Sequence, residues 1–193
     1  ESSPRVVPDR RVYFPADPGM QMIPTPGYGA NVEMWVLGSS LFGAQLAAAF
    51  GMPFAFASHF APDQLDQARM IYRQQFKPSP ALDKPHVMVA MNVFTAETDR
   101  DARTMASSQE QMFVAIRTGQ MHKVQPPIVD YRESLPMSAQ AMLDHVWEAS
   151  AVGSPETVRA GVNRFLERTQ ADELITSGST HGPATRRHSL SLA

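Results

Sequence analysis

The sequence predicts an α/β fold with about four parallel strands and flanking helices, which corresponds to half of a closed (β/α)8 barrel. Short apolar runs alternate with longer segments of helical periodicity, and this alternation favours parallel strands joined by helical crossovers. The apolar runs are nearly continuous, as in strands buried on both faces. At 193 residues the chain suits one domain core but is shorter than a closed barrel of about 250 residues.

Two segments of different character divide the chain. Residues 1–32 contain six prolines, which remove backbone donors and interrupt helices, so we expect an extended lead-in or linker there. Residues 33–193 carry the alternating pattern and are predicted to form one partial barrel domain. Because residue 1 is Glu and not Met, we expect a chain that has been processed or cut, or that is the tail of a longer protein.

The first unit is predicted as a strand, a small-residue turn and a helix. A short apolar run predicts a strand at residues 33–38, and helical spacing predicts a helix at residues 40–50. Gly51, followed by Met and Pro, is a typical helix end, and a second strand is expected at residues 54–57. The predicted apolar helix face consists of Phe42, Leu46 and Ala49.

The middle of the chain has the clearest strand, at residues 85–94, which are apolar and rich in β-branched side chains. The helix before it is predicted to begin with Pro62 at its first position and to extend to Phe76. A long helix follows the strand, from Thr98 to an expected end at Gly119.

The last part is predicted as a proline-rich excursion over residues 120–136 and then a helix over 138–150. Ser154 precedes Pro and Glu, which is a strong helix start. A short strand at residues 172–176 and a helix at 183–192 complete the order.

Composition excludes several function classes. The net charge is −2 and the basic residues are scattered, so neither a nucleic acid nor a membrane is expected as a partner. The absence of Cys removes disulfides, thiolate nucleophiles and Cys-ligated metals, and fits a cytoplasmic protein. The histidines lack metal-ligand spacing, so no metal site is predicted. There is no G-x-S-x-G elbow of the serine hydrolases.

The turn after the first strand is the stretch where chemistry is expected. Ser39 or Ser40 can cap the following helix, whose free N–H groups and positive dipole end also suit an anion such as phosphate. Gly38 and Gly43 would let a ligand approach the backbone closely. The alternative is an ordinary strand-to-helix turn with a serine cap, because the stretch matches neither common phosphate-loop pattern.

An ordered series of motifs resembles the luciferase-like monooxygenases, which are flavin-dependent TIM barrels. The resemblance extends from about residue 12 to the C-terminus. It covers what would be the C-terminal half of such a barrel, so the first four βα units are not in this chain. The motifs that carry it are Trp35-Val-Leu-Gly-Ser-Ser40, Gly51-Met-Pro-Phe-Ala-Phe-Ala57, His59-Phe60-Ala61-Pro62, Asn92-Val93-Phe94 and Val152-Gly153-Ser154-Pro155-Glu156-Thr157.

The resemblance implies a reaction and its cofactor. Such enzymes use reduced FMN, supplied by a separate flavin reductase, together with O2 to oxidise a small organic substrate, and some branches use the deazaflavin F420. The resemblance assigns the flavin phosphate to Gly38, Ser39, Ser40 and Gly43. The family usually has a polar residue and a Ser at the positions of Leu41 and Gly43, so weaker phosphate binding is expected.

His59 is the catalytic candidate, because it follows a strand on the face where barrel active sites form. The resemblance makes it a flavin-pocket contact or proton donor, and the alternative is a hydrogen-bonded structural His. His181 is a weaker pocket candidate, in a Gly/Ser-rich segment, Ser177–Gly182, that departs from the family pattern.

Two further functions remain open at this point: a non-catalytic remnant that binds flavin phosphate, and an F420-dependent reductase. Half a barrel would leave strand edges and an apolar face open. We therefore expect the chain to pair with itself or with an N-terminal barrel half.

Overall fold

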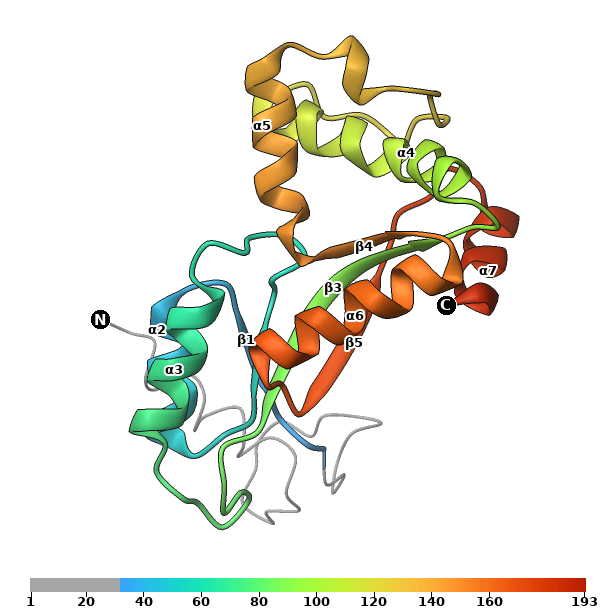
Figure 1. The fold of residues 1–193 in the computed structure, drawn as a ribbon. Coiled ribbons are helices and arrows are strands. Elements are labelled where there is room, and N and C mark those ends of the chain that lie inside the picture. Colours follow the sequence, from blue (N-terminus) through green and yellow to red (C-terminus); the bar gives the residue numbers. More distant parts are fainter. Residues whose placement is uncertain (1–31) are drawn as a thin grey trace, which may run out of the picture.

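A computed structural model describes residues 32–193, in which five parallel strands form one sheet (Figure 1). The first strand pairs with the second, the second with the third, and the third with the fifth. These four strands follow one another without the reversal of strand order that marks an open doubly wound sheet. This is the strand order of a (β/α)8 barrel, and it confirms the predicted parallel sheet with flanking helices. The strands are β1 (Val36–Gly38), β2 (Phe54–Phe56), β3 (Val87–Thr95), β4 (Ser150–Gly153) and β5 (Glu173–Ser177).

β4 is the strand that sequence analysis missed. Met88 of β3 pairs with both β2 and β5, whereas Asn92 pairs with both β4 and β5. Because a strand has two edges, β2 and β4 share one edge of β3, and β4 lies beyond the carboxyl end of β2. The helix predicted for residues 138–150 was wrong at its end: α5 covers Met137–Val146, and a 3-10 turn at Trp147–Ala149 leads into the strand.

The helices cover one face of the sheet and one end of it (Figure 1). α2 packs beside α3, and α6 lies across β3 and β4. α4 and α5 pack together at the carboxyl end of β3, where Phe94 and Trp147 form a second core. The helices are α2 (Leu41–Phe50), α3 (Leu65–Gln75), α4 (Asp99–Thr118), α5, α6 (Pro155–Thr169) and α7 (Pro183–Leu192), with a short 3-10 turn at Arg132–Ser134.

The main core lies between the sheet and α2, α3 and α6. Alternate residues of β3 point into it, as the period of two in a strand requires. From the helices, small side chains of α2 and larger side chains of α6 meet these strand residues. The buried members include Val87, Val89, Met91 and Val93 of β3, Ala44, Ala47 and Ala48 of α2, and Val158 and Phe165 of α6.

The opposite face of the sheet is open around two large apolar side chains. Leu37 of β1 is 71% exposed and Ile175 of β5 is 53% exposed, although their strand neighbours Val36 and Leu174 pack into the core. In a closed barrel this face lines the interior. Four barrel strands therefore leave the inner face of the barrel uncovered at these positions.

Several local predictions are confirmed. Gly51 and Gly119 end their helices in the left-handed conformation, with φ of 59° and 71°. Ser154 caps α6 by accepting a hydrogen bond from the Thr157 N–H group, and Pro155 follows at the first helical position. The lead-in predicted for residues 1–32 lies outside the described residues, apart from residue 32.

Other predictions were wrong in detail. α3 begins at Leu65 and not at Pro62, because residues after β2 form turns that carry side-chain bonds back to the sheet. The buried face of α2 is formed by small residues: Gly43, Ala44, Ala47 and Ala48. Of the predicted face, Leu46 packs against the core, whereas Phe42 and Ala49 are exposed. This face of α2 lies against the sheet, and a Cβ on Gly43 would be in contact with the Phe54 ring at 3.5 Å.

Candidate functional site

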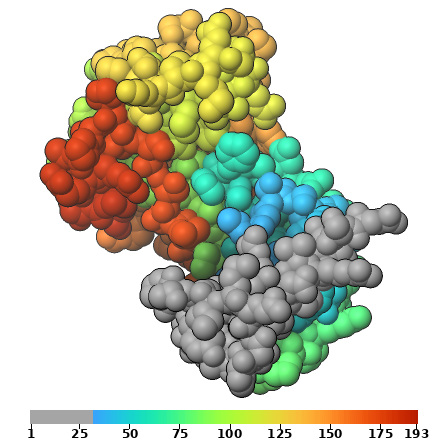
Figure 2. All heavy atoms as spheres, turned by 180° about the vertical axis from the view of Figure 1, so that it is seen from behind, coloured from blue at the N-terminus to red at the C-terminus, as the bar shows by residue number. Residues whose placement is uncertain are grey.

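The candidate site lies at the carboxyl edge of β1 and β2. These strands are parallel and paired up to Gly38 and Phe56, so the turns that follow them emerge side by side. The Ala57 N–H group donates to the Gly38 carbonyl oxygen at 2.9 Å, and the Leu41 N–H group donates to Gln64 Oε1 at 3.2 Å. The predicted phosphate turn and the predicted catalytic His59 are thus held on one edge. In Figure 2 the segment that follows β2 (teal) lies at the surface beside the start of the described chain (blue).

The turn Gly38–Ser40 presents unused donors. Ser40 occupies the N-cap position of α2 with extended backbone, but its side chain makes no capping hydrogen bond, so the predicted serine cap is wrong. Ser39 and Ser40 are both exposed. Within residues 32–193, neither serine hydroxyl has a partner, and the N–H groups of Phe42 and Gly43 have none. Together with the helix dipole, these donors form an arrangement that suits an anion.

The two glycines of this stretch, Gly38 and Gly43, lie in ordinary contact with their neighbours. A Cβ placed on Gly38 or Gly43 would meet its nearest neighbour at 3.5 Å or more, an ordinary contact distance. Packing within the described chain therefore does not require glycine at either position. The exposed serine hydroxyls and the free N–H groups of the first turn of α2 are donors of the kind that bind a phosphate group.

His59 lies in the turn after β2 and is half-buried. Burial lowers the pKa of its imidazole below the usual value of 6.5, because the charged ring is poorly solvated. Its Nδ1 atom is buried without a hydrogen-bond partner among residues 32–193. Burial therefore favours the neutral form of the ring, and it leaves one ring nitrogen without a partner among residues 32–193.

A buried amide network, which sequence analysis missed, fixes the backbone of His59. Asn92 of β3 is fully buried, and its Nδ2 donates to the His59 carbonyl oxygen at 2.7 Å. Gln109 of α4 donates to Asn92 Oδ1 at 2.8 Å and accepts from the Ser179 N–H group at 2.7 Å. The network ties the loops after β2 and β5 to α4. The sequence contained a signal for this network: Asn92 is an amide inside an otherwise apolar strand, and Gln109 is an amide in line with the apolar residues of a helix.

A set of ion pairs fastens the excursion after α4 to the two helices beside it. Arg132 donates to Glu110 Oε1 at 2.5 Å and to Asp144 Oδ1 at 2.6 Å. The Glu110 side chain is 7% exposed, and this burial raises the pKa of its carboxyl group while Arg132 opposes the rise. Arg132 also lies 5.9 Å from the Trp147 ring centre.

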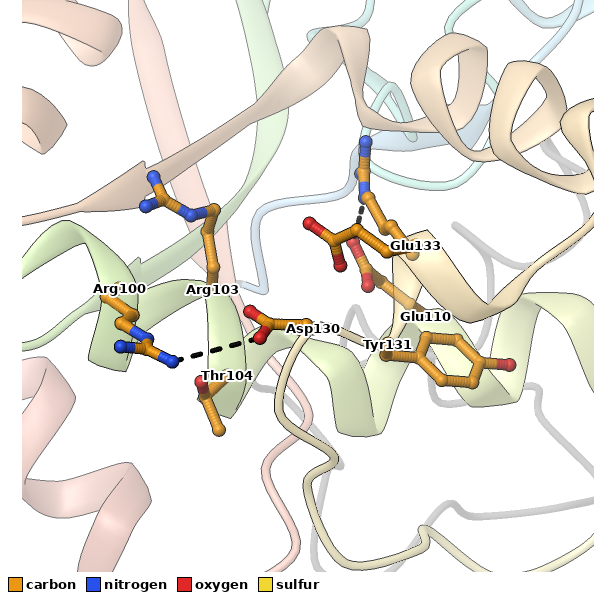
Figure 3. Close-up of a pocket in the computed structure, with 8 residues that line it drawn as sticks. Arg100, Arg103, Thr104, Glu110, Asp130, Tyr131 and Glu133 are labelled. Atoms are coloured by element: carbon orange, nitrogen blue, oxygen red, sulfur yellow. Dashed lines mark hydrogen bonds and ion pairs between the residues drawn. The ribbon is translucent and has the colours of Figure 1, made fainter.

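The same region contains a hollow of about 190 Å3 (Figure 3). Arg100 faces Asp130 across it at 3.8 Å, and the side chain of Arg103 is directed away from that pair. Acidic and basic side chains line the hollow together, and four of them form two ion pairs, Arg100 with Asp130 and Arg132 with Glu110. We therefore assign this region to holding the excursion in place and not to binding a cofactor.

The remaining candidates lie apart from the turn after β1. His181 is in the loop after β5, where its Nδ1 pairs with the Val124 carbonyl oxygen at 3.1 Å. Across the part of the chain that the structure describes, no cluster of His, Asp and Glu could hold a metal ion. None of the helices between residues 32 and 193 is both long and apolar enough to cross a membrane.

Comparison with known proteins then shows the family. The family model of the luciferase-like monooxygenases matches residues 6–173. The chain belongs to the luciferase-like monooxygenase family. A luciferase-like monooxygenase of Escherichia coli K12 is 42% identical to the whole chain, which covers 58% of that relative. The protein YvbT of Bacillus subtilis is 35% identical, again over the whole chain and 58% of its own length.

Solved structures support the same fold. The apo form of MsnO8 matches the whole chain with a TM-score of 0.78 and 25% identity, and the match covers 59% of that protein. The oxygenating constituent of 3,6-diketocamphane monooxygenase, a type II Baeyer–Villiger monooxygenase solved with FMN, matches 83% of the chain at a TM-score of 0.54 and 22% identity. This luciferase-like chain thus spans somewhat more than half the length of the E. coli and B. subtilis relatives and of MsnO8.

Proposed function

We propose that this chain carries the phosphate-binding turn of a flavin-dependent monooxygenase that uses reduced FMN and O2 to oxidise a small organic substrate. The observation that supports this function most directly is the turn Gly38–Ser40, with two free serine hydroxyls and the open N-terminus of α2. Membership of the luciferase-like family makes a flavin the appropriate phosphate-bearing ligand. When bound, reduced FMN would supply the electrons for the reaction with O2.

Each residue of the site then has a separate role. Ser39 and Ser40 would donate to phosphate oxygens, and Gly38 and Gly43 would leave the backbone accessible. His59, neutral because burial lowers its pKa, would exchange a hydrogen bond with the flavin or with the substrate through Nδ1. α4 would cover the carboxyl end of β3 and help to exclude water.

The proposal includes partners. The open inner face around Leu37 and Ile175 would be covered by an N-terminal barrel half or by a second copy of this chain. A separate flavin reductase would supply the reduced FMN. The cytoplasm would be the compartment of this chain and of the reductase. Sedimentation of the chain as a compact monomer that exposes its inner face to a hydrophobic dye would contradict the pairing.

A binding and turnover experiment tests the function. The chain would be titrated with reduced FMN without oxygen, and then mixed with O2 and an aliphatic aldehyde, alone and together with a supplied N-terminal barrel half. We expect saturable FMN binding by the chain and carboxylic acid formation once the barrel is complete. Binding without product under every condition would favour the non-catalytic remnant. Binding of F420 in preference to FMN would favour the deazaflavin reductase.

A further inference from the structure

A second pocket lies between α4, the excursion after it and the loop that leads into α7. Its volume is about 270 Å3. Met105 and Pro127 supply an apolar wall, whereas Ser108, Thr104, His181 and Thr185 supply polar groups. The pocket is on a different face of α4 from the ion pairs of Arg132. It includes part of Ser177–Gly182, the segment that departs from the family pattern.

Ser108 is the informative member of this pocket. The residue is 1% exposed, and its hydroxyl has no hydrogen-bond partner among the described residues. A serine inside a helix commonly bonds to the carbonyl group one turn earlier, and Ser107, the preceding residue, does bond to Thr104. A buried hydroxyl without a hydrogen-bond partner destabilises the folded protein. A ligand that accepts a hydrogen bond from Ser108 would remove this destabilisation.

The N-terminus of α7 supplies donors to the same pocket. α7 has ten residues and begins at Pro183, and Gly182 at its N-cap offers no side chain to cap it. The N–H groups of Ala184 and Thr185 have no acceptor within residues 32–193. The helix dipole and these N–H groups favour a negatively charged group at this end.

We propose that this pocket binds a small organic acid through its anionic group, a carboxylate or a phosphate monoester, with Ser108 and the first turn of α7 as the donors. The apolar wall would contact the carbon skeleton of the acid. Asp101 stands at the rim, and its carboxylate accepts a hydrogen bond from the Thr98 hydroxyl at 2.6 Å. Its charge opposes that of the ligand, so it would limit the affinity for the anion.

The experiment needs no flavin, and its outcome is therefore independent of the proposed monooxygenase function. The chain would be titrated with acetate and, separately, with inorganic phosphate at constant ionic strength, and amide chemical shifts would be recorded. We expect saturable shifts at residues 181–185 with one or both anions. Ser108→Ala should weaken that binding about tenfold, the effect of a lost hydrogen bond to a charged group. Tighter binding of acetate would point to a carboxylate ligand, and tighter binding of phosphate to a phosphate monoester.

Control variants separate this site from general effects. Ser138→Ala, on the exposed surface of α5, should leave anion binding unchanged. Asp101→Asn keeps a group that can bond to Thr98 and should strengthen binding two- to threefold, roughly the effect of removing one screened like charge. Ser39→Ala/Ser40→Ala should not affect this pocket. No saturation with either anion, or equal affinity in Ser108→Ala and Ser138→Ala, would overturn the proposal.

Discussion

Gln109 of α4 donates a hydrogen bond of 2.8 Å to Asn92 of β3, and both side chains are buried. The pair connects two elements that the chain supplies in succession, and through Asn92 it reaches the backbone of His59. An amide pair of this kind fixes geometry more than it adds stability, because each amide could bond to water in the unfolded chain.

Replacing Gln109 with Leu should therefore destabilise the fold by about 1–3 kcal/mol, since Asn92 Oδ1 and the Ser179 N–H group would both lose their buried partner. The free energy of unfolding from urea denaturation measures this effect. Gln45→Leu, at an exposed position of α2, is the matched control and should change stability by less than about 0.5 kcal/mol. Equal effects of the two substitutions would show that the network is not a structural requirement.

The pKa values of two histidines should depart from 6.5 in opposite directions. Burial lowers the pKa of His59 below 6.5, so its contribution to stability is complete above that pH and is lost as the pH falls through the lowered value. Hydrogen bonds that the His145 ring donates to the carboxylates of Asp63 and Glu148 raise the pKa of His145 above 6.5. Its contribution is therefore complete below that pH and is lost as the pH rises through the raised value.

An NMR titration of the imidazole signals would measure both values directly. We expect the His59 signal to change at a lower pH than the His145 signal. His59→Gln should remove the acidic loss of stability, and His145→Gln should remove the alkaline one. A His59 signal that titrates at or above 6.5 would contradict a buried, neutral ring.

The pair of Arg132 and Glu110 offers a comparison between a buried and an exposed ion pair. Arg132→Ala would leave the 7%-exposed Glu110 side chain without its cation, and should destabilise the protein by about 3 kcal/mol. Arg100→Ala breaks a pair whose two side chains are 71% and 62% exposed, and should change stability by less than about 1 kcal/mol.

A rescue variant makes the Arg132 prediction specific. In Arg132→Ala, the further change Glu110→Gln should restore part of the lost stability, because it removes the buried, unpaired charge. If the double variant is no more stable than Arg132→Ala, desolvation of Glu110 is not the cause of the loss.

Sequence patterns predicted the elements whose causes are local. Gly51, Gly119 and Ser154 end or begin helices through their own backbone freedom or hydroxyl group, and each was placed correctly. The same reasoning placed the turn after β1 at the carboxyl edge of a parallel sheet. The family resemblance, carried by motifs from Trp35 onward, identified the barrel half and was confirmed by the family match.

Features that depend on distant partners could not be predicted in this way. β4 consists of the small sequence Ser-Ala-Val-Gly, and it is a strand only because β3 extends beyond β2 and offers a free edge. The amide network requires Asn92 and Gln109 to meet across the fold. Ser40 occupies the cap position, but its rotamer depends on surroundings that spacing does not specify.

The central claim is that the turn Gly38–Ser40 binds the phosphate of FMN. Its most direct test is to compare the affinities of FMN and riboflavin, which differ by that phosphate, in the unchanged chain and in Ser39→Ala/Ser40→Ala. We predict that FMN binds more tightly than riboflavin, and that the double variant loses about 10- to 100-fold of FMN affinity while riboflavin affinity stays the same. If both flavins lose affinity equally, or if neither does, the phosphate does not lie on this turn.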